Sequence, residues 1–496
     1  MSWETVIGLE VHVQLLTRSK MFCGCSAKYG DPPNTNVCPV CLGLPGALPV
    51  PNEEAVRLAV RAACALGCTV HTRSVFARKN YFYPDLPKGY QISQYEEPLA
   101  TRGTLEIESP DRGPLTVGIT RLHLEEDAGK SFHDRFPGLT AVDLNRSGVP
   151  LIEIVSEPDL RTPAEARAYL TALKQVLRWL GVSDCNMEEG SLRVDANVSV
   201  RPIGERRFGT RREVKNMNSF SGLERAIAHA TTRLVDEYRA YGDKKSIVVL
   251  GEMFRIAEED KAIAQATLTF DAATATTSVV RSKEESHDYR YFPEPDLPPL
   301  VLSDAWLQGV RDGLPELPAA RRRRFELQYG LAPSEAAVVA ATAAIADHFE
   351  RLAALLGTGA GKDAWNWEAN DVVALSEGSE AVPDALPPER IAEVVGLVRS
   401  NTLSRQAAKK VLAAMLTDPG PARAIADRLG LIQVQDAGAI EDWVREVVAA
   451  HAAEVERYRA GETKLLGFLT GQAMKRSQGK ADPKAVTAAL ARILGS

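Results

Sequence analysis

Alternating apolar and polar residues mark two strands in the N-terminal part of the chain. In residues 6–15 every second residue is apolar, and Glu10 and His12 lie between the apolar positions. Residues 192–201 follow the same period of two, with Asp195 among the polar positions. Because successive side chains of a strand point to opposite faces, each pattern predicts a strand with one buried face and one polar face.

A helical period occupies residues 163–180. Thr162, Pro163 and Glu165 stand where an N-cap, a first-turn proline and the second member of a capping box are expected. Apolar residues then recur at intervals of three and four, and Gly181 stands at the expected end. The sequence therefore predicts an amphipathic helix, whose apolar stripe is formed by Leu170, Leu173, Val176, Leu177 and Leu180.

The character of the chain changes near residue 300. Short β-type runs and aromatic loops dominate the first part, whereas the remainder is alanine-rich and helical. The proline-rich segment 293–299 interrupts regular structure, and a second break is expected at 400–404, after a helix that begins near Pro388. We predict an α+β fold with an N-terminal domain of mixed β-sheet and helices (1–295), an all-α helical domain (296–403) and a small helical tail domain (404–496).

Composition narrows the class of protein. Hydrophobic residues make up 45% and charged residues 25% of the 496 positions, which is typical of a soluble globular chain and excludes disordered and collagen-like classes. The longest stretch without a charged residue, 32–52, holds six prolines and cannot form a membrane helix. The first residues lack the pattern of a signal peptide, so we expect a cytoplasmic protein.

Four of the seven cysteines are spaced C-x-C-x12-C-x2-C, at Cys23, Cys25, Cys38 and Cys41. Two pairs of thiolates on short knuckles suit a tetrahedral zinc ion. The alternative is four unrelated buried cysteines. Zinc held by four cysteines is structural, because such a site leaves no open position for water.

Carboxylates gather in three further segments. Residues 123–131 place Glu125, Glu126 and Asp127 beside a lysine, and segments 143–153 and 212–218 add further carboxylates, including Glu153 and Glu213. Carboxylates with a histidine are hard ligands that hold Mg²⁺ while substrate phosphates complete its shell. The alternative for each residue is an ordinary solvated surface charge. No P-loop explains the segment, because Leu124 stands where its first glycine is required.

Two segments mix aromatic and basic residues in the manner of nucleic-acid-binding loops. They are residues 76–90, which include Lys79, Asp85 and Lys88, and residues 287–293. Aromatic packing beneath a loop is the alternative interpretation.

The C-terminal tail differs from the rest of the chain in charge. Residues 451–496 hold eight Lys and Arg against four Asp and Glu, although the whole chain has a net charge of −6. A local basic cluster on an acidic protein indicates an RNA backbone as partner. Lysines that only solvate an amphipathic helix are the alternative. The cluster consists of Lys475, Arg476, Lys480 and Lys484.

Taken together, these segments resemble a known family over nearly the whole chain. The chain is similar to the B subunit of the bacterial aspartyl/glutamyl-tRNA amidotransferases. The segments that carry the resemblance are 7–15, 38–46, 79–91, 124–130, 145–159, 195–199, 214–220, 288–293 and 467–475.

The resemblance implies an enzyme of translation, a glutamine-dependent carbon–nitrogen ligase. Proteins of this family use ATP and Mg²⁺ to phosphorylate the side-chain carboxylate of Glu on tRNA(Gln) or of Asp on tRNA(Asn). Ammonia channelled from the amidase, which is the A subunit, then displaces the phosphate, and a small C subunit completes the heterotrimer. The implied architecture is a cradle domain, a helical domain and a tRNA-binding tail of the YqeY-like type.

The resemblance also implies roles for individual residues. The Mg²⁺-binding positions would be Glu10, His12, Glu125 and Glu153, and the catalytic set would comprise Glu125, Glu153, Asp195 and Glu213. The pocket or channel positions would be Lys79, Asp85, Lys88 and Glu126. The four cysteines would bind structural Zn²⁺, and Lys475, Arg476, Lys480 and Lys484 would contact tRNA.

The sequence departs from the family pattern at residues 265–271, where the usual Glu and Arg are missing. A rival hypothesis is a non-catalytic protein that binds tRNA or serves assembly, with structural carboxylates. ATP hydrolysis that depends on aminoacyl-tRNA would reject this rival.

Overall fold

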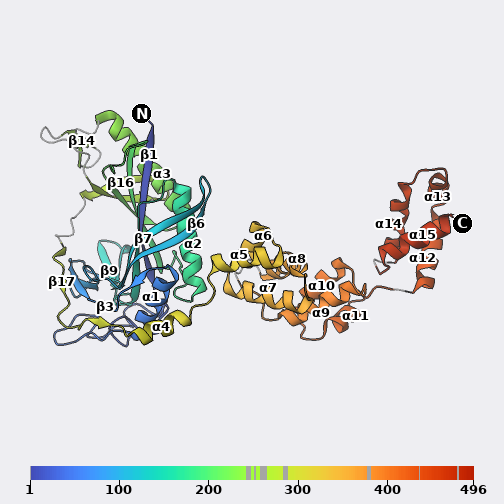
Figure 1. Ribbon diagram of the computed structural model, residues 1–496, viewed down its shortest axis with the longest axis horizontal. Coiled ribbons are helices and arrows are strands. Elements are labelled where there is room, and N and C mark those ends of the chain that lie inside the picture. Colours follow the sequence, from blue (N-terminus) through green and yellow to red (C-terminus); the bar gives the residue numbers. More distant parts are fainter. Residues whose placement is uncertain are drawn as a thin grey trace. The chain divides into compact units, whose positions relative to one another are not determined.

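The computed structural model describes residues 2–241, 247–250, 253–256, 265–282, 289–376, 381–434, 436–477 and 480–495. The chain divides into two compact units, residues 1–317 and 318–496. Unit 1 contains the sheets, and unit 2 is helical (Figure 1). The predicted α+β class is therefore confirmed. No helix in the described ranges is long and apolar enough to cross a membrane.

A nine-stranded sheet forms the centre of unit 1, in the order β16-β15-β12-β11-β1-β10-β7-β6-β2. All neighbours are antiparallel except β12 and β15, so the sheet is mixed. Strand β1, predicted from the alternation in residues 6–15, lies near its middle. The strands are β1 (Trp3–Gln14), β2 (Thr69–Val70), β6 (Ala100–Ser109), β7 (Gly113–Glu126), β10 (Pro150–Ser156), β11 (Leu192–Pro202), β12 (Arg212–Met217), β15 (Ala266–Asp271) and β16 (Thr276–Ser282).

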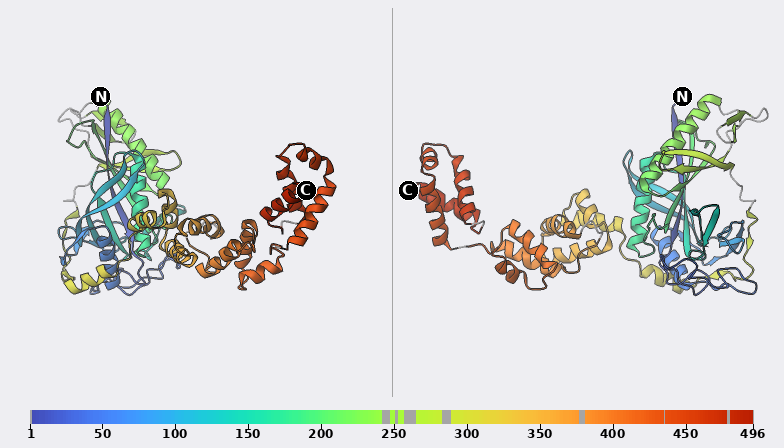
Figure 2. Two further views of the ribbon diagram at one scale, coloured as in Figure 1. Left: turned by 45° about the vertical axis from the view of Figure 1, so that its right-hand side comes forward. Right: turned by 180° about the vertical axis from the view of Figure 1, so that it is seen from behind.

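Three helices cover one face of this sheet: α1 (Glu53–Ala65), α2 (Pro163–Trp179) and α3 (Phe220–Tyr241) (Figure 2). The apolar residues of β1 and β11 belong to the same buried cluster as the predicted stripe of α2. The two faces of the sheet therefore differ: one is sealed by helices, and the polar residues of the alternating strands point to the other. This difference positions the candidate site.

The start of α2 differs from the predicted capping box in one contact. Thr162 Oγ1 accepts from the backbone N–H of Glu165 at 3.2 Å, as expected. The Glu165 carboxylate, however, accepts from the backbone N–H of Arg161 at 2.7 Å rather than from that of Thr162. It also forms a 2.6 Å ion pair with Arg112.

Small sheets complete unit 1. Strand β4 (Ala77–Asn80) pairs with β5 (Tyr90–Ser93) and β17 (Phe292–Pro293), and β3 (Arg73–Ser74) pairs with β18 (Leu300–Val301). The hairpins β8 (Lys130–Phe136)–β9 (Leu139–Asp143) and β13 (Ile247–Leu250)–β14 (Met253–Ile256) are separate.

The end of unit 1 lies beyond the predicted boundary at 295/296. Strands β17 and β18 return to β4 and β3, and α4 (Asp304–Asp312) packs against α1. The compact unit therefore extends to Leu317. The three-domain division itself stays a prediction.

Unit 2 contains eleven α-helices among its described residues. Helix α9 begins at Pro388, as predicted, and α10 and α11 pack against it. The last four helices bury an apolar cluster of their own, which includes Val444, Leu469 and Leu490. The helices are α5 (Pro318–Tyr329), α6 (Pro333–Val339), α7 (Ala343–Leu356), α8 (Gly361–Trp367), α9 (Pro388–Arg399), α10 (Arg405–Met415), α11 (Ala422–Arg428), α12 (Ala437–Ala450), α13 (Ala452–Arg459), α14 (Leu465–Arg476) and α15 (Pro483–Gly495).

Candidate active site

A row of four polar side chains crosses the open face of the central sheet. His123 on β7 faces Glu153 on β10, which in turn faces His12 on β1, which faces Arg193 on β11. Directly paired residues of neighbouring strands place their side chains on the same face, about 5 Å apart. Strand register thus gathers residues that lie far apart in the chain.

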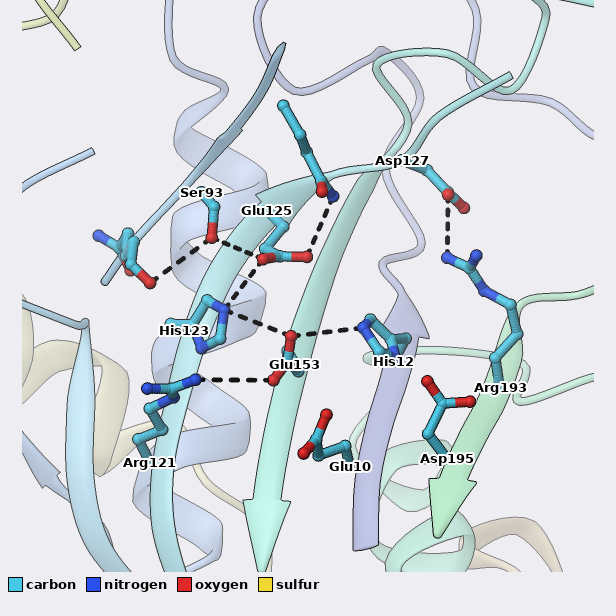
Figure 3. Close-up of polar contacts among 12 residues, drawn as sticks. Glu10, His12, Ser93, Arg121, His123, Glu125, Asp127, Glu153, Arg193 and Asp195 are labelled. Carbon is cyan, nitrogen blue, oxygen red and sulfur yellow. Dashed lines mark hydrogen bonds and ion pairs between the residues drawn. The ribbon is translucent and has the colours of Figure 1, made fainter. Parts of the chain in front are cut away.

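Two members of this row, His12 and Glu153, lie close to Glu125 of β7, and these three residues are potential metal ligands. His12 Nε2 lies 3.3 Å from Glu153 Oε2, and His123 Nε2 lies 3.1 Å from Glu125 Oε1 and 3.7 Å from Glu153 Oε2. One ligand atom from each of His12, Glu125 and Glu153 lies within 4.8 Å of the others. Figure 3 shows Glu125 between Ser93 and His123, and Glu153 between His123 and His12. Two carboxylates and an imidazole at these separations fit a divalent cation such as Mg²⁺.

Both carboxylates are held in the ionised state that metal binding requires. Burial opposes ionisation of Glu125, but the hydrogen bond from His123 and the charge of Lys79 lower its pKa to about 2. Burial likewise opposes ionisation of Glu153, whose pKa is nevertheless held well below its usual range by His123 and His12. Burial disfavours the protonated form of His12, yet its contact with Glu153 raises the pKa of the imidazole.

Three predicted residues, Glu10, Asp195 and Glu213, lie on the same face but outside this group of ligands. Glu10 is paired in register with Asp195, and its Oε1 accepts from Asn197 Nδ2 at 2.8 Å. Lys215 joins the other two, because its Nζ lies 2.6 Å from Asp195 Oδ2 and 3.5 Å from Glu213 Oε1. These carboxylates therefore form a second polar group, neutralised by a lysine.

Asp127 anchors the far end of the row. Its carboxylate accepts from Gln14 Nε2 at 2.7 Å and lies 2.9 Å from Arg193 Nη2 and 3.8 Å from Arg146 Nε. Burial raises the pKa of this carboxyl group, but Arg193 and Arg146 outweigh burial and lower it. The result is a fixed ion pair beside His12.

Of the predicted pocket residues, Lys79 interacts with the charge of Glu125, and Lys88 pairs with Glu126. Burial disfavours the charged form of Lys79, but the carboxylates of Glu125 and Glu153 raise the pKa of its ammonium group. Lys79 Nζ lies 5.1 Å from the ring centre of Tyr289, in a setting suited to a cation–π contact.

The other predicted pocket residues have polar partners. Lys88 pairs with Glu126, whose Oε1 also accepts from the backbone N–H of Ile92 at 3.0 Å. Asp85 accepts from Ser131 Oγ at 3.0 Å and is not one of the three grouped residues His12, Glu125 and Glu153. His287 and Asp288 of the predicted aromatic segment lie outside the described residues.

The four predicted cysteines converge in unit 1. One sulfur atom from each of Cys23, Cys25, Cys38 and Cys41 lies within 4.8 Å of the others. The Sγ atoms of Cys38 and Cys41 are 3.9 Å apart, close to the about 3.8 Å edge of a tetrahedron with 2.3 Å Zn–S bonds. Hydrogen bonding with Cys23 and the nearby charge of Lys20 lower the pKa of the Cys41 thiol to about 4. The donor set fits zinc.

The cysteine knuckles are tied to the start of β10, the strand that carries Glu153. The backbone N–H of Met21 donates to Gly148 O at 2.7 Å, and Asn145 Nδ2 donates to Pro32 O at 2.7 Å. Buried Lys20 donates to Asn36 O at 2.7 Å and Leu144 O at 3.2 Å. These bonds connect the segment that holds the cysteines to residues 144–148, the loop that leads into β10.

Residues 266–271 of the divergent segment form strand β15, which lies between β12 and β16 in the central sheet. Thr267 Oγ1 donates to Glu213 Oε2 at 3.0 Å, so this segment contacts one of the predicted catalytic carboxylates.

In unit 2, the basic residues of the tail separate into two groups. Lys475 and Arg476 line a hollow of about 900 Å³ between α12 and α14, together with Glu446, His451 and Gln472. Arg476 pairs with Glu446 at 2.5 Å. Lys480 and Lys484 lie after α14 and in the first turn of α15 and do not line this hollow.

Sequence reasoning missed the contacts made by β5. Gln91 Nε2 donates to Glu125 Oε2 at 3.1 Å, and Ser93 Oγ donates to Glu125 Oε1 at 2.5 Å. Their alternation with buried Ile92 is a signal of a short strand with a polar face, but four residues are too few to separate it from a loop.

Comparison with known sequences agrees with this geometry. Residues 5–308 match the family described as "GatB/GatE catalytic domain", and residues 347–494 match the family described as "GatB domain". A protein of Prosthecochloris aestuarii is 49% identical over 98% of this chain and 97% of its own length. Proteins of Halorhodospira halophila and Chlorobaculum tepidum are each 48% identical over all of this chain and at least 99% of their own.

All three relatives are named as the B subunit of aspartyl/glutamyl-tRNA(Asn/Gln) amidotransferase. The identities extend through both units, and the catalytic-domain match spans the whole polar face of the sheet. The chain therefore belongs to the family of aspartyl/glutamyl-tRNA(Asn/Gln) amidotransferase B subunits.

Proposed function

We propose that this chain activates and amidates Glu on tRNA(Gln), Asp on tRNA(Asn), or both, as one component of a multi-subunit ligase. The observation that carries the proposal is the convergence of His12, Glu125 and Glu153 on the open face of the sheet. It lies within the segment that matches the GatB/GatE catalytic domain.

The proposed reaction requires a protein surface that positions the reactants and neutralises phosphate charge. A carboxylate is a poor acyl donor to ammonia, so the side-chain carboxylate first attacks the γ-phosphorus of ATP, and the bond to ADP breaks. Ammonia then attacks the carbonyl carbon of the acyl phosphate, the C–O bond to phosphate breaks, and the nitrogen loses a proton. Phosphoryl transfer of this kind depends on positioning and charge neutralisation rather than on a protein nucleophile.

Residues of this chain would supply both. His12, Glu125 and Glu153, with Glu10 nearby, would hold Mg²⁺, which supplies charge neutralisation for the phosphates when it is bound. Asp195 and Glu213, held by Lys215, would orient groups on the neighbouring strands. Lys79, Lys88, Asp85 and Glu126 would line the path of ammonia. The four cysteines would hold a structural Zn²⁺ ion, whose role is to stabilise the fold.

The partners follow from the same proposal. Another protein must release ammonia from glutamine, since no nucleophile–base pair suited to that hydrolysis is evident in the described part of this face. We expect two protein partners, the amidase (the A subunit) and a small C subunit, and tRNA bound through Lys475, Arg476, Lys480 and Lys484. The site of action would be the cytoplasm, where aminoacyl-tRNA is made.

The decisive experiment is transamidation by the reconstituted complex. Wild-type complex should convert Glu-tRNA(Gln), Asp-tRNA(Asn) or both to the amide, with one ATP hydrolysed per amide formed. A complex in which ATP hydrolysis and amide formation are absent while tRNA still binds would favour the rival hypothesis, a non-catalytic assembly protein.

A further inference from the structure

Gln91 on β5 makes three hydrogen bonds, two of which reach Glu125 and Glu126 on β7. Its Nε2 donates to Glu125 Oε2 at 3.1 Å and to the backbone carbonyl of Glu126 at 2.7 Å. Its Oε1 accepts from Tyr81 O–H at 3.1 Å. A primary amide offers two N–H donors, and both are used. Gln91 is 7% exposed, so water does not compete freely for these contacts.

These partners define which way the amide points. A carbonyl and a carboxylate can only accept, so the nitrogen must face Glu126 and Glu125. The Tyr81 hydroxyl donates to the remaining oxygen. A rotated amide would set its oxygen against two other acceptors, so Gln91 has a single satisfied orientation.

The two oxygens of Glu125 are then unequally occupied. Oε1 accepts from Ser93 Oγ at 2.5 Å and contacts His123 Nε2 at 3.1 Å. Oε2 accepts from Gln91 Nε2, which leaves one of its lone-pair positions without a partner among the described residues. The Gln91 contact therefore determines which oxygen remains able to bind a cation and in which direction it points.

We propose that Gln91 is a positioning residue, which acts on the reaction by orienting the Glu125 carboxylate as a metal ligand. The inference rests on the proposed function for its catalytic consequence, but the orientation of the ligand can be tested by metal binding alone. Groups one step away from a metal commonly change its affinity about 10–100-fold when they are replaced.

Gln91→Glu is the most selective variant. It keeps the length of the side chain and the acceptor for Tyr81, but it replaces the donor to Glu125 with a second carboxylate. Gln91→Met keeps the volume without adding charge and serves if the first variant folds poorly. Tyr81→Phe is the matched control, because it removes the third contact and leaves both donated bonds of Gln91 in place.

The test is Mn²⁺ binding to the reconstituted complex, followed by electron paramagnetic resonance without ATP or tRNA. We expect Gln91→Glu and Gln91→Met to weaken Mn²⁺ binding by about tenfold or more. Both should also lower kcat for amidation while KM for aminoacyl-tRNA stays within about twofold, and excess metal should partly restore turnover of Gln91→Met. Tyr81→Phe should change Mn²⁺ affinity by less than about threefold.

Mn²⁺ affinity within about twofold of wild type in both Gln91 variants would overturn the inference. The same holds if tRNA KM and metal affinity worsen together, since that is the result of a general loss of structure. A wild-type complex that binds Mn²⁺ but forms no amide would contradict the proposed function and leave the orienting role of Gln91 supported by its own measurement.

Discussion

Glu125 shows how a single residue can be buried and still be charged. Its side chain is 2% exposed, yet Ser93, His123 and Gln91 all contact its oxygens, and the charge of Lys79 helps to lower its pKa to about 2. Each contact replaces a hydrogen bond that water would have provided. A charge prepared in this way can bind a cation without first losing a proton.

Glu125→Gln tests this charge. The substitution keeps the size of the side chain but replaces the charged carboxylate with a neutral amide. We therefore expect the rate of amidation to fall by a factor of about 10² or more. Affinity for tRNA should stay within about twofold, because the basic residues of the tail lie in unit 2. Filter binding and single-turnover amidation measure the two effects. Equal losses of tRNA binding and turnover would indicate a structural role instead.

Cys38→Ser tests the four-cysteine group. Removing one thiolate should release the metal and destabilise unit 1 together, because ligand binding energy in such sites is folding energy. Metal content by mass spectrometry and the thermal unfolding midpoint should both fall, whereas Cys185→Ser, a buried cysteine outside the group, should leave metal content unchanged. Zinc-free wild-type protein with four freely reactive thiols would contradict this prediction.

At the scale of the element, the ionised side chain of Glu165 links the start of α2 to Arg112 and Arg161. Burial raises the pKa of Glu165, but the hydrogen bonds from Arg112 and from the backbone of Arg161 lower it to about 2, from an ordinary value of 4.5. Because the folded state favours the ionised form, this contribution to stability is present above about pH 4.5 and is lost as the pH falls toward 2.

Glu165→Gln should therefore lower the unfolding midpoint of unit 1 at pH 7 by on the order of 2–4 °C. The difference from wild type should shrink as the pH falls from about 4.5 toward 2. Differential scanning calorimetry across this range measures the effect. The control is Glu54→Gln, which removes an exposed pair with Arg57 and should change the midpoint by less than about 1 °C. A difference that is independent of pH would contradict the assignment.

The same scale shows what the sequence could predict. Alternation placed Glu10, His12 and Asp195 on polar faces, and the three- and four-residue spacing in α2 identified its buried stripe, because each signal depends only on neighbours along one element. Resemblance, not periodicity, associated Glu125 and Glu153 with His12.

Other features could not be read from local patterns. The position of β1 between β10 and β11 depends on pairings between residues that are remote in the chain, such as His12 with Glu153 and with Arg193. The contact of Gln91 with Glu125 requires β5 to pass beside β7. The ion pair of Glu165 with Arg112 likewise joins residues that are remote in sequence. Such contacts are set by tertiary packing.

At the scale of the whole molecule, the candidate site and the basic cluster of the tail belong to different units. The group of His12, Glu125 and Glu153 belongs to unit 1, whereas residues 451–496 carry an excess of basic residues against an overall net charge of −6. A polyanion would be attracted to the tail and repelled by much of the remaining surface. This division predicts that tRNA binding and chemistry can be separated by mutation.

Truncation after residue 434 should remove tRNA binding by the tail and leave the other helices folded. Helices α10 and α11 pack against α9, so a deletion from 405 would expose the apolar face of α9 as well. Helices α12–α15 bury their own apolar cluster, so their removal should leave the other helices of unit 2 intact. In the reconstituted complex, we expect the apparent KM for aminoacyl-tRNA to rise about tenfold or more and its steep salt dependence to weaken. Glutamine hydrolysis by the amidase subunit proposed as its partner should persist.

Reversing one charge tests whether the basic side chains of the tail bind tRNA, separately from the effect of removing the whole tail. Lys475 is exposed and lines the hollow between α12 and α14, so Lys475→Glu should weaken tRNA binding with little change in the thermal midpoint. Lys410 is exposed on α10 and lies outside the cluster of Lys475, Arg476, Lys480 and Lys484, so Lys410→Glu alters the net charge equally and should have a smaller effect. Filter binding at two salt concentrations measures both variants. If the truncated complex and Lys475→Glu bind tRNA as tightly as wild type at the same salt concentration, tRNA is held elsewhere, and the basic residues of the tail only solvate its helices.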